Sequence, residues 1–355
     1  MDSSYVSLGS SLPVPNLQEL VRENMITVPP RYVRPDQDPP VAFASESFPM
    51  VPTVDMERLL HEESMPLELE KLHSACKDWG FFQLVNHGVS TSLIEKMKSE
   101  TQELFNLSLE EKKRYWQESG DLEGFGQAFV FSENQKLDWG DMFYMATLPI
   151  HKRKHSLFEK LPFSFRETVE TYALELQKLA MTLLNFMSSA LKMDAEELRE
   201  LFEDGYQGMR TNYYPPCPQP HLVVGLAPHS DAVGLTILLQ ISEVPGLEIR
   251  KDEIWVPVKP LPNAFVVNVA DTLEMITNGV YRSVLHRATV NSAQERISVA
   301  TFYSPKLTAE IGPSDSLINP QNPPLYRRVT MEKYLKALLA RELNGKSLIE
   351  TMKIK

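Results

Sequence analysis

The sequence predicts a mainly β core flanked by helices, in the class of β-sandwiches and barrels. Two observations lead to this fold class. Between residues 205 and 305 the chain breaks into short β-branched and aromatic runs, separated by Pro, Gly, Asn and Asp at fairly regular spacing. Before and after this region the apolar residues instead recur at helical spacing. The expected order is therefore a helical N-terminal part, a β core and a C-terminal helix.

The composition is that of a globular protein, and the charge excludes some classes of partner. Hydrophobic residues make up 43% of the 355 residues and charged residues 23%. The formal net charge of -11 repels phosphate backbones, so we expect no nucleic-acid partner, and no basic run suggests a membrane partner. No apolar run is long enough to span a membrane, the start lacks a secretory signal, and there are two cysteines. We expect a cytoplasmic protein, and a monomer.

The N-terminal half divides into an arm and a helical region. Residues 1–50 are rich in Pro and Ser and are expected to form an extended arm lying over the folded body. Residues 51–200 are expected to form the helical N-terminal region of the same body. Its predicted elements are a short strand and helix within 51–60, a helix over 67–79 ended by Gly80, a strand over 81–89 and a helix over 92–108.

Helix starts are predicted where a capping residue precedes an acidic one by helical spacing. Ser108 with Glu111 fits this pattern, and Ser164 with Glu167 repeats it before a long amphipathic helix over 165–192. Asp194 with Glu197 opens a further helix.

The β core is predicted over residues 205–305, and the chain returns to helix after it. The expected strands cover residues 208–214, 221–227, 235–240, 246–251, 254–259, 264–269, 283–290 and 296–303. In the C-terminal region, 306–355, Met331, Tyr334, Leu335, Leu338 and Leu339 share one helical face, and Gly345 lies past its end. This helix either covers the mouth of a site as a lid or only packs on the core.

Two of the eight histidines fall inside the β core, and an aspartate accompanies one of them. In a strand, residues i and i+2 point to the same face, so His229 and Asp231 can both face inward. His286, from a neighbouring strand, would complete the two-histidine, one-carboxylate facial triad of non-haem Fe(II) oxygenases. Each residue alone fits a turn or a satisfied core position better, so both readings stay open. The other histidines fit solvated, packed or turn positions, with His87 expected to bond to the backbone.

A buried arginine follows the second histidine of this group. Arg296 and Ser298 share one face of a predicted strand, while Glu295 points to the other face. A buried guanidinium needs a partner, and a carboxylate bound through both oxygens suits it best. That partner is either the carboxylate of a ligand or a distant Asp or Glu.

These residues together resemble the iron- and 2-oxoglutarate-dependent dioxygenases of plants. The resemblance rests on His229-x-Asp231, His286 and Arg296-x-Ser298, and it extends over roughly residues 50–350. Within the family, the sequence is most similar to the group that includes the senescence-related oxidoreductases and the thebaine and codeine O-demethylases. FNLSLEEKKRYWQ (105–117) supports this narrower group. The segments that match the family as a whole are NYYPPCPQP (212–220), LPNAFVVNVAD (261–271), SVLHRATVN (283–291) and WGFFQLVNHGV (79–89).

The resemblance implies a fold, cofactors and roles for single residues. The fold is a double-stranded β-helix (a cupin-like jelly roll) with iron at its open end. The cofactors are Fe(II), 2-oxoglutarate and O2, with ascorbate as reductant. The implied roles are metal binding and catalysis for His229, Asp231 and His286, 2-oxoglutarate binding for Arg296, Ser298, Asn212 and Tyr214, and substrate contact for Phe302, Phe125 and Arg210.

The implied activity is hydroxylation or oxidative O-demethylation of a small aromatic plant metabolite, such as an alkaloid, a flavonoid or another phenolic, with release of succinate and CO2. Two alternatives remain: an oxidase with the same triad that does not use 2-oxoglutarate, and a non-catalytic binding protein on the same fold. Asn212 and Tyr214 favour 2-oxoglutarate, and the complete triad favours an enzyme. The chain departs from the family at Ala270, where glycine is frequent, and at Pro228; neither departure removes a ligand.

Overall fold

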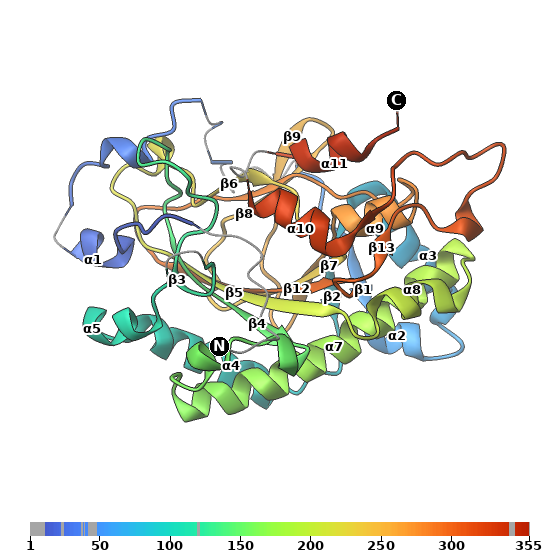
Figure 1. Cartoon of the computed structure of the whole chain (residues 1–355), viewed down its shortest axis with the longest axis horizontal. Helices are drawn as coiled ribbons and strands as arrows, with labels where there is room; N and C mark the ends of the chain where they lie inside the picture. Colours follow the sequence, from blue (N-terminus) through green and yellow to red (C-terminus); the bar gives the residue numbers. More distant parts are fainter. Residues whose placement is uncertain are drawn as a thin grey trace.

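Two facing β-sheets form the core of the protein (Figure 1). The computed structural model describes residues 11–22, 25–36, 38, 40–41, 48–118, 121–340 and 345–354. The large sheet has eight strands in the order β1-β2-β10-β7-β12-β5-β4-β3, and the small sheet has four in the order β6-β11-β8-β9. Apolar side chains from both, including Leu238 and Val266 of the large sheet and Ile249 and Val256 of the small one, pack together. The two-sheet core flanked by helices that the sequence predicts is confirmed.

The strands of the large sheet are β1 (Thr53–Asp55), β2 (Phe81–Val85), β10 (Phe265–Val269), β7 (Leu235–Gln240), β12 (Arg296–Ser304), β5 (Tyr206–Tyr214), β4 (Asp141–Leu148) and β3 (Gly124–Gly126). Those of the small sheet are β6 (Leu226–His229), β11 (His286–Ala288), β8 (Leu247–Lys251) and β9 (Ile254–Pro257), and β13 (Glu310–Ile311) pairs with β14 (Val329–Thr330).

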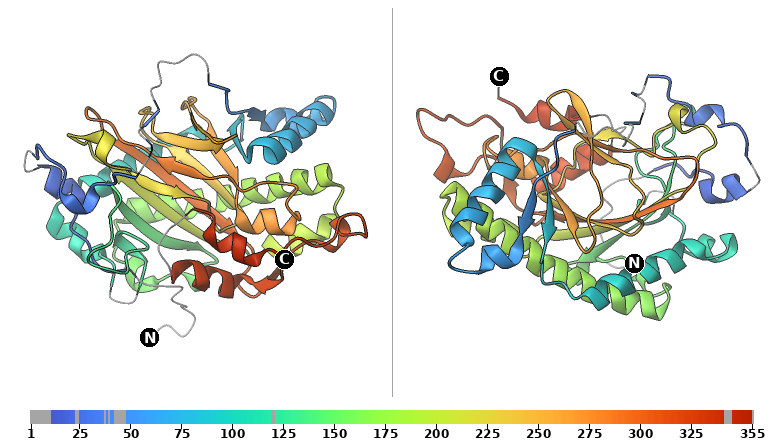
Figure 2. Two further views of the ribbon diagram at one scale, coloured as in Figure 1. Left: turned by 90° about the horizontal axis from the view of Figure 1, so that it is seen from above. Right: turned by 180° about the vertical axis from the view of Figure 1, so that it is seen from behind.

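The helix α7 (Phe163–Leu191) supports the outer face of the large sheet, where Figures 1 and 2 show it running beneath β4 and β5. Its buried residues, among them Tyr172, Leu176 and Leu183, join the main apolar core with strand residues such as Met209 and Val299. The other helices are α1 (Leu17–Arg22), α2 (Met56–Leu60), α3 (Met65–Ser74), α4 (Thr91–Asn106), α5 (Leu109–Lys112), α6 (His155–Phe158), α8 (Ala195–Phe202), α9 (Asp271–Ile276), α10 (Met331–Leu339) and α11 (Ser347–Met352). In the described part of the chain, no helix has the length and apolar character needed to cross a membrane.

Three predicted helix boundaries are confirmed. Ser108 forms a reciprocal capping box with Glu111 at the start of α5. The carboxylate of Asp194 accepts a hydrogen bond from the backbone of Glu196 and caps α8. Gly80 ends the segment after α3 in a left-handed conformation, with φ of 65°.

The predicted cap at Ser164 is wrong. Helix α7 begins earlier, at Phe163, after Pro162, which has no side chain able to cap it. Ser164 therefore lies inside the first turn, where its hydroxyl donates to Glu100 of α4 instead. The serine ties two helices together rather than starting one.

The N-terminal arm, predicted to be extended, contains the helix α1 (Leu17–Arg22).

The predicted strand over 221–227 is also wrong at its start. Pro220 opens a short 3-10 turn, and the strand begins only at Leu226. Val223 in this run packs against residues of the N-terminal arm, including Leu17 in α1. An apolar run that is buried against a distant segment looks the same in the sequence as a buried strand. The strand predicted over 283–290 is likewise shorter, His286–Ala288.

Replacement of Gly80 by alanine is expected to destabilise the fold by several kcal/mol. An added Cβ at Gly80 would lie 2.2 Å from the carbonyl oxygen of Arg282, so the backbone must shift. Gly88 is a matched control, since its φ is also positive, at 78°, but a Cβ there would meet no atom within 4 Å. Gly88→Ala should cost only about 1 kcal/mol, from the left-handed conformation alone. Urea unfolding of both variants measures the difference, and equal losses would contradict the steric argument.

Candidate metal centre and active-site cavity

Three buried side chains converge at one end of the small sheet. In the antiparallel pairing of β6 with β11, His286 lies directly opposite His229. Asp231 follows β6 by two residues, and its Oδ1 lies 3.5 Å from Nε2 of His229 and 3.7 Å from Nε2 of His286. One ligand atom of each residue lies within 4.8 Å of the other two, which is close enough for all three to hold one metal ion.

Hydrogen bonds orient each of the three side chains. Nδ1 of His229 lies 2.8 Å from the carbonyl oxygen of Ala227, and Nδ1 of His286 lies 3.2 Å from that of Val284. Each imidazole is then a donor at Nδ1 and leaves Nε2 free for a metal. Two further donors hold the outer carboxylate oxygen of Asp231, Oδ2: the hydroxyl of Thr236 at 2.6 Å and the amide of Asn268 at 2.9 Å.

The electrostatics keep the group in the protonation states that a metal requires. Burial alone would raise the pKa of Asp231, but His286, His229 and the hydroxyl of Thr236 outweigh it and hold the pKa below its usual range. Burial, with a smaller contribution from His229, lowers the pKa of His286 to about 4. At neutral pH the carboxylate is therefore ionised and the imidazole of His286 is neutral, as metal ligands must be.

A second group of polar side chains faces the metal centre from the large sheet. The register of β12 with β5 sets Arg296 opposite Tyr214 and Ser298 opposite Asn212. All four line one small cavity, together with the triad. The predicted cluster of these residues is thus brought together by the pairing of two strands.

Arg296 is a buried cation without an anionic partner among the described residues. It is 3% exposed, and one of its terminal guanidinium nitrogens donates a hydrogen bond to Oε1 of Gln240 at 3.3 Å. Within the described part of the chain, Nε of Arg296 and Oδ1 of Asn212 have no hydrogen-bond partner. Burial lowers the pKa of Arg296, and the neighbouring Tyr214 opposes this. An anionic ligand with several oxygens would satisfy these atoms, which is the chemistry of a dicarboxylate such as 2-oxoglutarate.

A larger cavity opens beside the metal centre. Phe302 and Arg210, two of the predicted substrate residues, line it together with His229 and Asp231. Phe125 does not join them, because it pairs with Phe143 across β3 and β4 and packs against Phe105 in the apolar core. The rest of the cavity wall includes the predicted helical-face residues Leu335, Leu338 and Leu339. It also includes residues for which no site role was predicted: Asp121, Leu122, Glu123, Ala128, Phe129, Met142, Tyr144, Tyr206, Gly208, Ser230, Ala232, Val233 and Ser304.

Helix α10 contributes three leucines to this wall. Leu335, Leu338 and Leu339 belong to the apolar face that the sequence pattern identifies. Tyr334 of the same helix bonds to Asp271 at 3.3 Å. The helix thus both packs on the core and lines the cavity.

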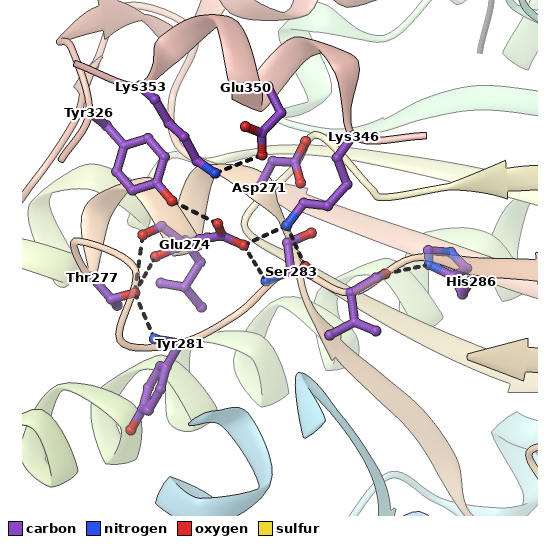
Figure 3. A network of polar contacts seen from close by, with 12 residues as sticks. Asp271, Glu274, Thr277, Tyr281, Ser283, His286, Tyr326, Lys346, Glu350 and Lys353 are labelled. Atoms are coloured by element: carbon purple, nitrogen blue, oxygen red, sulfur yellow. Dashed lines mark hydrogen bonds and ion pairs between the residues drawn. The ribbon is translucent and has the colours of Figure 1, made fainter. Parts of the chain in front are cut away.

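The segment after α10 is tied to the strands of both histidines. The backbone N–H of Gly345 donates to the carbonyl of Pro228, next to His229. Figure 3 shows Lys346 reaching Glu274, at 2.9 Å, and the carbonyl of Ser283, at 2.6 Å. The other carboxylate oxygen of Glu274 accepts from Tyr326, at 2.7 Å. This network holds the loop that leads into His286.

The two departures from the family pattern leave this geometry intact. Ala270 has φ of -119°, an extended conformation that any residue adopts. Pro228 lacks an N–H, and its carbonyl accepts the bond from Gly345. As expected, His87 lies outside the cluster and accepts a hydrogen bond from the backbone of Val89 at 3.2 Å.

Comparison with known proteins agrees with the site. Residues 205–305 match the family model of the 2OG-Fe(II) oxygenase superfamily, and residues 51–162 match that of the non-haem dioxygenase in morphine synthesis N-terminal. The chain is 51% identical to Protein SRG1 of Arabidopsis thaliana, with 100% of each chain covered. It is also 51% identical to thebaine 6-O-demethylase of Papaver somniferum, with 99% of each covered, and to oxoglutarate-dependent flavonoid 7-O-demethylase 1 of Ocimum basilicum, with 98% of this chain and 93% of that one covered.

A solved structure also matches over almost the whole length. The crystal structure of JOX2 in complex with 2OG, Fe and JA has a TM-score of 0.87 and 35% identity, and the match covers 97% of this chain and 99% of that one. The predicted double-stranded β-helix with N-terminal helices is thereby confirmed. With these full-length relatives and a buried two-histidine, one-carboxylate group, the chain belongs to the 2OG-Fe(II) oxygenase superfamily and is a 2-oxoglutarate-dependent, non-haem iron dioxygenase.

Proposed function

We propose that this dioxygenase hydroxylates or oxidatively O-demethylates a small aromatic plant metabolite: an alkaloid, a flavonoid or another phenolic. The observation that carries the proposal is the cavity beside the triad, whose wall is largely apolar and includes the rings of Phe129 and Phe302. Such a wall suits a flat aromatic molecule. Two full-length relatives at 51% identity are named for O-demethylation, one of thebaine and one of flavonoids.

The residue roles are part of the proposal. His229, Asp231 and His286 bind Fe(II) through Nε2, Oδ1 and Nε2, and Arg296 with Ser298, Asn212 and Tyr214 binds 2-oxoglutarate. The bound iron, 2-oxoglutarate and O2 together supply the oxidation of a substrate C–H bond, with succinate and CO2 as products. Thr236 and Asn268 hold Asp231 so that one oxygen faces the metal position. The leucines of α10 exclude water from the cavity.

Among the alternatives, the use of 2-oxoglutarate is favoured by Arg296. An oxidase without a dicarboxylate co-substrate would need another anion to pair with this buried guanidinium, whereas 2-oxoglutarate supplies a carboxylate itself. Ascorbate as reductant, a monomeric state and a cytoplasmic location stay predictions from the sequence.

The proposed activity is tested with O-methylated and unsubstituted aromatic metabolites. Purified protein with Fe(II), ascorbate and 2-oxoglutarate should release succinate faster when a methoxylated alkaloid, flavone or simple phenol ether is present. Mass spectrometry should then show loss of a methyl group or gain of one oxygen. If no member of the panel raises succinate release above the rate without substrate, the proposed substrate class is wrong.

Loss of one triad histidine is expected to abolish metal binding while the fold persists. His286→Ala should weaken Co(II) or anaerobic Fe(II) binding by more than about 100-fold, because changes around metal ligands already cost about 10- to 100-fold. His221→Ala, at an exposed histidine outside the site, is the control and should bind normally. Metal titration with circular dichroism of both variants makes the comparison. Normal metal binding by His286→Ala would refute the ligand assignment.

Two buried arginines are expected to respond in opposite ways to replacement by methionine. Arg296→Met should weaken 2-oxoglutarate binding by about 100-fold or more, the loss of about 3 kcal/mol typical of a buried charge pair, without destabilising the ligand-free protein. Arg287 instead pairs with Glu248 at 2.7 Å, and both are fully buried. Arg287→Met should therefore cost about 3–5 kcal/mol of stability. Isothermal titration measures the affinity for 2-oxoglutarate, and urea unfolding measures the stability of each variant. A large loss of stability in Arg296→Met would contradict the assignment of Arg296 to ligand binding.

A further inference from the structure

The substrate cavity has one acidic side in an otherwise mainly apolar wall. Asp121 and Glu123 line it where the chain enters β3, and both are buried, at 8% and 4% exposure. Around them the wall includes Leu122, Met142 and Phe129. An acid buried among apolar groups is costly unless a partner compensates its charge, so the partners of these two carboxylates decide what the cavity can bind.

Asp121 has a cationic partner within the protein. Its Oδ2 accepts from Nζ of Lys154 at 2.7 Å, and the same ammonium contacts Glu118 at 3.0 Å. Glu118 is 62% exposed and does not line the cavity. Lys154 thus makes its direct contacts with these two carboxylates and forms no ion pair with Glu123.

Glu123 has no cationic partner among the residues that the structure describes. Its Oε2 accepts the backbone N–H of Ala146 at 3.0 Å, and no hydrogen bond or ion pair is formed by Oε1 within that part of the chain. The nearby Arg153 is occupied by Glu170, at 2.7 Å, and by the carbonyl of Thr147. Arg210, which also lines the cavity, forms no ion pair with Glu123. One carboxylate oxygen of Glu123 is therefore available to a ligand.

The protonation behaviour of Glu123 agrees with this geometry. Burial raises the pKa of Glu123 to about 8, and the charge of Asp121 adds to the rise. The N–H of Ala146 and, to a smaller extent, the charges of Lys154 and Arg153 oppose it. The carboxyl group is thus largely neutral at pH 7 while the cavity lacks a cation. A positively charged ligand group at Oε1 would favour ionisation and gain a charge-assisted hydrogen bond.

We propose that Glu123 determines substrate specificity by binding a protonated amine of the substrate, while the carbon to be oxidised faces the triad. The inference rests on the proposed function and narrows its substrate class to aromatic compounds that carry a basic nitrogen. The rings of Phe129, Tyr144 and Tyr206 line the same cavity and add faces that attract organic cations. A neutral hydrogen-bond donor would also satisfy Oε1, but it would gain no charge-assisted hydrogen bond and would not favour ionisation of Glu123.

The test compares two probes with the same aryl ether: 4-methoxyphenethylamine, which is cationic, and its neutral N-acetyl derivative, in which the nitrogen also carries an acetyl group. Binding to the full-length protein loaded with Fe(II) and 2-oxoglutarate is measured anaerobically by calorimetry. The amine should bind at least about tenfold more tightly than the amide, the least expected of a buried charged pair. Glu123→Gln keeps the size of the side chain and an acceptor for Ala146, and it should remove this preference without weakening the amide.

Glu118→Gln is the matched control, because it removes a charge from the same acidic group outside the cavity. It should keep the preference for the amine, together with its Fe(II) binding and thermal melting. If Glu123→Gln does not fold, Glu123→Asp replaces it and should lower amine affinity by shortening the reach to the ligand. Equal affinities for the two probes in the unmodified protein, no binding of either at millimolar concentration, or a preference that survives in Glu123→Gln would overturn the inference.

The proposed function fails on a different result. Stimulation of succinate release by the neutral N-acetyl probe, or by neutral flavones, supports the dioxygenase activity on aromatic ethers whatever Glu123 does. A lack of stimulation by every aromatic compound, charged or neutral, overturns the proposed function itself.

Discussion

The antiparallel pairing of β6 with β11 is the constraint on which the rest of the site depends. It sets His286 opposite His229, and both rings then face the carboxylate of Asp231. A shift of register by one residue would turn His286 to the other face of the sheet and dissolve the metal centre. Two further contacts stabilise this register. Strand β8 pairs with the other edge of β11, and the ion pair of Lys346 with Glu274 helps to hold the loop that precedes β11.

Buried charged residues of two kinds occur in the core: those paired with an opposite charge of the protein, and those that lack such a partner among the described residues. Arg287 and Glu248 satisfy each other, and Asp231 is surrounded by donors and histidines. Arg296 and Glu123 lie as deep, yet neither has a partner of opposite charge in the described chain. Such groups lower the stability of the ligand-free protein and strengthen the binding of ligands that complete them. One is suited to an anion beside the metal, the other to a cation in the substrate cavity.

Helix ends were predicted correctly where the residues that stabilise them are close in the sequence. The capping box at Ser108, the cap at Asp194 and the left-handed Gly80 were predicted from a few neighbouring residues, which also provide the bonds or the conformation concerned. Ser164 has the same spacing as Ser108, but its hydroxyl bonds to Glu100 on another helix. The strand expected at 221–227 failed for a similar reason, because the apolar run is buried by the N-terminal arm. In both cases a contact with a distant segment overrode the local pattern.

By itself, the sequence predicted a β core, and the period-two spacing of its strands put His229 with Asp231, and Arg296 with Ser298, on shared faces. The family and the roles in binding 2-oxoglutarate followed from the resemblance that these residues carry. Tertiary structure alone decided the substrate cavity. Phe125 was predicted to touch the substrate, but its pairing with Phe143 turns it toward the helices, whereas Met142 and Tyr144, on either side of Phe143, line the cavity. Glu123 gave no signal in the sequence. Its proposed role depends on the absence of an ion pair with Lys154 or Arg153. These cations pair instead with Asp121 and Glu170, through contacts between residues far apart in the chain.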